Sequence, residues 1–247
     1  MNFAVSAVVL ILFAAVLELY CRHLNPYMKW DRKEKTESGQ SGDSLNLSTM
    51  KIFASSGFFV VIVVAFMRTT LEQASKTLAP VMLMECYENI SPSMGNLLNL
   101  MILLSGILGM VLVRQLMYPK RIKNELKGLI VTLVLAAPAT AVLLLVGKFG
   151  LPVTIAAFCI SCAAFTGSSL FTSFYANCFV KYGKSATVAG GLNAAAAVGM
   201  IAAGYGFLRV SELWNWQIVI ALWIGLIVIA MVLLVAILPR YRQFKQM

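Results

Sequence analysis

The sequence predicts an all-α integral membrane protein, a polytopic helix bundle of about seven spans. Of its 247 residues, 60% are hydrophobic and only 12% are charged, and the mean hydropathy is +0.84. This composition lies outside the range of soluble domains. The apolar runs are each close to the roughly 20 residues that span a bilayer as a helix. They lack the period-two alternation of an outer-membrane barrel, so helices are the spanning structure that fits.

Seven apolar runs are expected to cross the membrane, and they show no repeat of the solenoid kind. In chain order they are Asn2–Tyr20, Ile52–Met84, Met94–Met117, Gly128–Gly147, Leu151–Phe179, Ala186–Phe207 and Asn215–Leu238. Proline suits a first helical turn and interrupts a helix interior, so Pro92 is expected to open a helix, Pro119 to close one and Pro239 to end the last. The second run would be about 50 Å long as one straight helix, so it is expected to tilt, break or project beyond the lipid.

These elements divide the chain into three parts. Residues 1–21 are expected to form a single transmembrane helix, residues 22–50 a polar cytoplasmic linker rich in Ser and Gly, and residues 51–247 a six-helix unit. The first run has no basic n-region and no small-residue cleavage site, which makes it a poor signal peptide. An outside N-terminus so close to a span is unusual, so we expect the chain to be the latter part of something longer.

The net charge of +10 is interpreted as membrane topology rather than as a nucleic-acid interface. Alternate connections hold sixteen of the lysines and arginines, whereas the intervening connections hold only Lys148 and Arg209. By the positive-inside rule the crowded side is cytoplasmic. The chain is therefore expected to be a multi-pass protein of the plasma (inner) membrane with its C-terminus in the cytoplasm. The lipid bilayer is an expected partner and nucleic acid is not.

This order of elements resembles the C-terminal half of a major facilitator superfamily transporter, from its sixth to its twelfth helix. In that superfamily a central cytoplasmic loop joins two six-helix halves. FMRTTLEQASKTLAP (66–80) resembles the seventh helix of organophosphate/phosphate antiporters, where an intramembrane Arg engages the substrate phosphate. ATVAGGLNAAAAVGMIAAGYG (186–206) resembles the small-residue eleventh helix. The loop LMYPKRIKNELKG (116–128) departs from the usual superfamily pattern, since it has Pro119 and no Asp. The resemblance implies a secondary active carrier, a symporter or antiporter, that works by alternating access.

Three charged residues at the middle of the second run are the main candidate site. Arg68, Glu72 and Lys76 are spaced four apart, so they share one helix face. Charges at this depth normally face a bundle interior or a water-filled cavity. The face has one excess positive charge, which predicts an anionic substrate held by Arg68 through a bidentate contact. Glu72 would hold the cations in register when the site is empty, and it is a candidate for a coupling proton.

The same three charges can instead neutralise one another and only stabilise the bundle. The compensating acid can equally come from the other half of a carrier. Two further candidates are Tyr175, which falls where some organophosphate carriers place a His, and Asn193, whose amide needs partners in lipid. The hydroxyl and amide side chains between Thr166 and Asn177 are interpreted mainly as helix-packing groups.

The predicted function is membrane transport of a small organic anion or phosphate ester. The expected protein partner is an N-terminal six-helix half or a second copy, because such carriers bind substrate between two halves. One alternative is a non-transporting truncated half, or a membrane interaction or receptor module. Another is an intramembrane hydrolase using Gly167-Ser168-Ser169, but the only histidine is His23 in the linker. We expect no enzyme, cofactor or metal site.

The charge distribution predicts the side of the membrane on which each connection lies. On a background without the five native cysteines, cysteines at positions 43 and 247 should react with an impermeant thiol reagent only after cells are opened. Cysteines replacing Asn89 and Glu212 should react in intact cells. Labelling of position 43 from outside would reverse the predicted orientation.

Overall fold

A computed structural model describes residues 49–88, 90–117, 122 and 124–246, and every regular element in these ranges is a helix. The expected first span Asn2–Tyr20 and the linker up to position 48 lie outside the described residues, as do Asn89 and Pro119. Within the described part, six helical segments are long and apolar enough to cross a membrane. They are Phe58–Thr77, Pro92–Met117, Glu125–Leu145, Leu151–Tyr182, Ser185–Leu213 and Trp216–Gln246. The all-α membrane bundle agrees with the prediction.

The long second run is broken at two points. It forms α3 (Thr49–Ser56), α4 (Phe58–Thr77) and α5 (Ala79–Cys86). Gly57 separates α3 from α4 in a left-handed conformation with φ 75°, and a Cβ there would overlap the Ile237 side chain, so only glycine fits. Pro80 lies in the first turn of α5 and cannot donate a backbone hydrogen bond to α4. The excess length is therefore accommodated by breaks.

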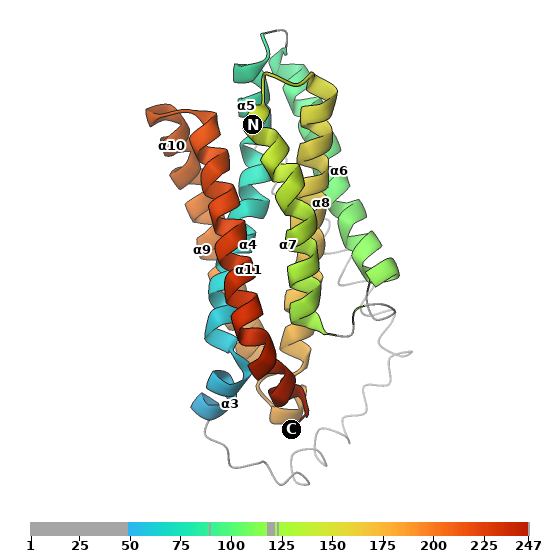
Figure 1. Cartoon of the computed structure of the whole chain (residues 1–247), viewed down its shortest axis with the longest axis vertical. Helices are drawn as coiled ribbons and strands as arrows, with labels where there is room; N and C mark the ends of the chain where they lie inside the picture. The colour runs from blue at the N-terminus through green and yellow to red at the C-terminus, as the bar shows by residue number, and fades with distance from the viewer. Residues whose placement is uncertain (1–48, 89, 118–121, 123, 247) are drawn as a thin grey trace, which may run out of the picture. The chain divides into compact units, whose positions relative to one another are not determined.

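The remaining helices follow with short connections (Figure 1). They are α6 (Pro92–Leu112), extended by a π-helical turn at Val113–Met117; α7 (Glu125–Val142), with a 3₁₀ turn at Leu143–Leu145; α8 (Leu151–Asn177), followed by a 3₁₀ turn at Val180–Tyr182; α9 (Ser185–Ala202), with a π-helical turn at Ala203–Phe207; α10 (Leu208–Leu213); and α11 (Trp216–Gln246). Pro92 opens α6 as predicted, with Ser91 as the N-cap that accepts the Met94 N–H.

The prediction that Pro239 ends the last helix is wrong. α11 continues through Pro239 to Gln246. Tyr241 and Phe244 are buried in the bundle, and the Lys245 ammonium lies 2.8 Å from a carboxylate oxygen of Glu125 on α7. These contacts hold the final turns in helical conformation although Pro239 removes one main-chain hydrogen bond.

The helices pack in a pattern that repeats. α8 contacts α6 and α7, and α4 contacts α9 and α11; the remaining interhelical pairs include α4 with α8 and α7 with α11 (Figure 1). Exchanging the triplet α4–α6–α7 with the triplet α8–α9–α11 maps each of these pairs onto another pair or onto itself. Because each triplet crosses the bundle three times, the two triplets run in opposite directions. The described bundle thus has the contact pattern of two inverted three-helix repeats.

Two glycines occupy equivalent places in this pattern. A Cβ at Gly109 of α6 would overlap the backbone of Ala163 on α8, and a Cβ at Gly199 of α9 would overlap the carbonyl of Phe66 on α4. Each glycine is followed, one turn later, by a π-helical turn. Small residues let membrane helices approach to backbone contact, and here they fix the pairs α6–α8 and α4–α9.

Alanine at Gly109 or Gly199 should therefore destabilise the bundle. Because the added Cβ meets backbone rather than a flexible side chain, we expect about 1–3 kcal/mol of overpacking strain and a lower thermal unfolding temperature in detergent. Gly225→Ala is the matched control, since a Cβ at Gly225 meets nothing within 4 Å. Equal unfolding temperatures for all three variants would contradict the close packing.

Candidate functional site

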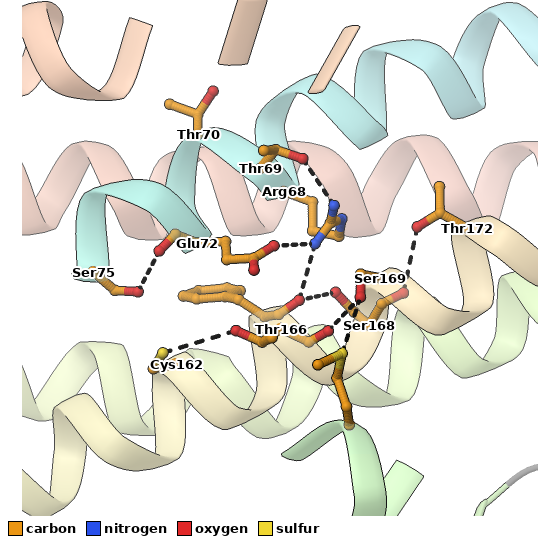
Figure 2. A network of polar contacts seen from close by, with 12 residues as sticks. Arg68, Thr69, Thr70, Glu72, Ser75, Cys162, Thr166, Ser168, Ser169 and Thr172 are labelled. Atoms are coloured by element: carbon orange, nitrogen blue, oxygen red, sulfur yellow. Dashed lines mark hydrogen bonds and ion pairs between the residues drawn. The ribbon is translucent and has the colours of Figure 1, made fainter. Parts of the chain in front are cut away.

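The three predicted charges of α4 form a ladder within one helix. The Arg68 Nη1 atom lies 2.6 Å from Glu72 Oε2, and the Lys76 Nζ atom lies 2.6 Å from Glu72 Oε1. Figure 2 shows the Glu72 carboxylate directed at the guanidinium. One carboxylate therefore bridges two cations, and the ladder keeps one excess positive charge.

The Arg68 guanidinium also joins α4 to α8. Nη1 donates a 3.1 Å hydrogen bond to the Phe165 carbonyl. Nη2 donates a 2.8 Å bond to Thr69 Oγ1 (Figure 2). Three of its five N–H donors are thus used, whereas the buried Nε has no hydrogen-bond partner among the described residues. An unpaired buried donor costs about 1–3 kcal/mol, and more on a charged group. The residue is only 6% exposed, so water contributes little to its solvation.

Arg68 also lines a cavity of about 310 Å³ between α4, α8 and α9. This volume lies at the lower end of the range of small-molecule sites. The polar groups of its wall come from all three helices; they are Arg68, Ser169, Thr172, Ser173, Asn177, Ser185 and Asn193. The apolar part of the wall consists mainly of small residues, since four of its five members are alanines. Arg68 is the one charged member of this wall, and the asparagine amides and hydroxyls add neutral donors.

The cavity runs from the middle of the bundle toward one end. Arg68 lies at the middle of α4, whereas Asn177 and Ser185 flank the turn that joins α8 to α9. That turn carries Lys181 and Lys184, and the positive-inside rule predicts that it is cytoplasmic. The hydroxyl and amide groups therefore lie toward that turn, and Arg68 lies at the inner end of the cavity.

The predicted site residues are only partly brought together. Arg68 and Asn193 line the same cavity, from α4 and α9. Glu72 and Lys76 are linked to it through their ion pairs and lie outside its wall.

Tyr175 does not line the Arg68 cavity. Its hydroxyl donates a 3.2 Å bond to the Ser56 carbonyl, and its ring packs 5.4 Å from that of Tyr241. Thr172, Ser173 and Ala176 occupy the cavity side of α8, so the intervening Tyr175 is turned toward α3 and α11.

Sequence reasoning underrated the polar face of α8. Ser169, Ser173 and Asn177 line the cavity although they were interpreted as packing groups. Their spacing of four residues in an apolar helix is the signal that identifies a shared face. The Ser169 hydroxyl donates to the Thr166 carbonyl and that of Ser173 to the Ser169 carbonyl, so each leaves its oxygen free to accept and can rotate to donate.

Ser168, a serine of the hydrolase alternative, is hydrogen-bonded to the backbone of its own helix. Ser168 is buried, and its hydroxyl donates to the Phe165 carbonyl at 2.5 Å. His23, the only histidine in the sequence, lies outside the described residues.

Comparisons of the chain with protein-family models, with curated proteins and with solved structures find no match, so the interpretation rests on the site's own geometry.

The direction of the cavity can be tested by thiol labelling. On a cysteine-free background, Ser173→Cys and Asn193→Cys should react with an impermeant thiol reagent applied to the cytoplasmic face, because both residues are exposed in the cavity wall. Ser168→Cys is the matched control, since it is an equally small change on the same helix at a buried position. Reaction of Ser168→Cys at the same rate would contradict the described cavity.

Proposed function

We propose that this chain is a transporter half of the major facilitator type, which binds a small anion at Arg68 and moves it by alternating access. One observation about Arg68 carries the proposal. A buried arginine at the middle of a membrane-spanning helix lines a polar cavity while its Nε has no acceptor among the described residues. Intramembrane charges of this kind mark substrate and ion pathways.

The contact pattern of the helices supports the transporter class. Inverted three-helix repeats within a six-helix half are the architecture that major facilitator carriers use, with substrate held near the bilayer midplane. The pairing of α4–α6–α7 with α8–α9–α11 is compatible with that architecture. The exposed face of α9 supports a facing half as partner, because Gly190 and Ala194 on it are exposed and a Cβ at Gly190 would meet nothing within 4 Å.

The charges support an anion as substrate. Two cations share one carboxylate, and a mobile anion would balance the remaining charge. The donors of Arg68 that these hydrogen bonds leave unused are Nε–H, which is buried, and one N–H of Nη2, so an oxyanion that reaches the guanidinium need not displace Glu72. A carboxylate or a phosphate ester is the class of group that a guanidinium recognises in this way.

A structural role for the ladder is the competing proposal. Glu72 bridges both cations, which is also what a ladder that only stabilises the bundle would do. In that case the cavity would need no ligand, and the chain would act as a membrane interaction module.

Replacement of Arg68 separates the two proposals. Arg68→Ala should weaken binding of a phosphate or carboxylate probe by about 10–100-fold, the loss expected for hydrogen bonds to a charged group. Arg68→Lys should recover little, because an ammonium cannot reproduce the guanidinium fork. Binding would be measured by calorimetry on the purified chain with inorganic phosphate, glycerol 3-phosphate and succinate, and transport by counterflow in proteoliposomes with and without a six-helix partner half.

Two further variants complete the test. Arg209→Ala is the control for a lost arginine, since Arg209 is exposed and pairs only with Glu212 among the described residues. The double variant Arg68→Leu, Glu72→Leu removes the ion pair without leaving an unpaired charge. Anion binding and counterflow at the native level in this double variant would show that the ladder is structural and would overturn the proposed anion site.

A further inference from the structure

A second cavity lies at the end of the bundle where α3 meets α11. It has a volume of about 290 Å³, and its wall includes Lys51, Ser55, Tyr182, Arg240 and Phe244. These residues come from α3, from the turn after α8 and from the part of α11 beyond Pro239. None of them lines the cavity at Arg68, so this is a separate site.

The cations of this cavity have no local counter-charge in the described part of the chain. Lys51 and Arg240 are both exposed, and neither forms an ion pair with a described residue. Glu125 is the one described carboxylate at this end of the bundle, and it already accepts hydrogen bonds from Tyr241 and Lys245. Among the described residues, nothing balances the positive field that these two cations present to a ligand.

Aromatic rings form much of the remaining wall. The rings of Tyr182 and Phe244 are stacked with centroids 5.4 Å apart. The Lys181 ammonium lies 4.9 Å from the Tyr182 centroid and 5.9 Å from that of Phe244, so a third cation covers the same pair of rings. Charged groups beside an apolar wall suit a ligand with an anionic head and an apolar body.

The position of the cavity identifies the source of that ligand. The cavity lies at the ends of two membrane helices, at the face that the positive-inside rule predicts to be cytoplasmic. Basic pockets between helices at this level bind phospholipid head groups. We propose that this cavity binds the phosphate of an anionic phospholipid, with Lys51 and Arg240 as its ligands and the Tyr182–Phe244 pair against the glycerol and upper acyl carbons.

Such a lipid would bridge two elements that lie far apart in the sequence. Lys51 lies on α3, which Gly57 separates from α4, and Arg240 lies on the extension of α11 past Pro239. One phosphate bound by both cations would hold α3 against α11. The proposal is independent of the anion site at Arg68.

The test is lipid binding by the purified full chain, measured by native mass spectrometry and by thermal unfolding with added lipid. Phosphatidylglycerol should bind and raise the unfolding temperature, whereas phosphatidylcholine should not. Lys51→Ala and Arg240→Ala should each weaken phosphatidylglycerol binding about fivefold, and the double variant about 25-fold, the effect expected of a basic residue at an anionic membrane surface. Arg209→Ala, which removes an exposed arginine of α10, should leave this binding unchanged.

Arg242→Ala is the matched control. Arg242 is an exposed arginine two positions from Arg240 on the same helix, and it does not line the cavity. A loss with Arg242→Ala equal to that with Arg240→Ala would mean general attraction to a basic surface and would overturn the site. Equal stabilisation by soluble glycerophosphoglycerol, the same head group without acyl chains, would assign the cavity to a soluble anion and would overturn the lipid.

Discussion

The burial of one cation at the centre of the bundle is the constraint on which the rest depends. Arg68 is held by Glu72 on its own helix and by the Phe165 carbonyl of α8. Phe66 and Ala163, two positions earlier on the same two helices, are the residues that receive Gly199 and Gly109. The guanidinium therefore lies beside the contact between α4 and α8, which relates the two triplets. The close packing of α9 on α4 and of α6 on α8 occurs within two residues of the same point. A charge in lipid is tolerated only where protein groups solvate it, so the helices must converge there.

The features that depend on local chemistry could be predicted from the sequence. Long apolar runs predict the spanning helices, and Gly57 and Pro80 are the positions at which an overlong run can break. The spacing of Arg68, Glu72 and Lys76 predicts their ladder, because residues four apart must meet on a helix. Asn193 reached the Arg68 cavity as expected, since a polar amide in an apolar helix needs an interior environment.

The features that depend on packing between distant segments could not be predicted from the sequence. Tyr175 misses the cavity because the rotation of α8 is set by its neighbours, which place Thr172 and Ser173 in the cavity wall instead. Helix α11 passes Pro239 because Tyr241 and Phe244 gain burial against distant elements. The basic cavity joins Lys51 to Arg240, and the two triplets repeat in contacts rather than in residue identities. Each of these features results from contacts between residues that are far apart in the sequence, and neither hydrophobic periodicity nor helix propensity predicts such contacts.

The net charge of the proposed anion site determines whether transport of an anion would need a coupled proton. Arg68, Lys76 and Glu72 together carry one positive charge, so a bound monoanion makes the site neutral, whereas a dianion leaves one negative charge. A neutral site can reorient in the bilayer at low electrostatic cost, but a charged one cannot. Glu72 is the candidate group to correct the balance: its two cations favour the ionised form, so it would take up a proton only when the second charge of a bound dianion offsets them. In the proposed carrier a monoanion would therefore cross without a proton, and a dianion would cross with one proton on Glu72.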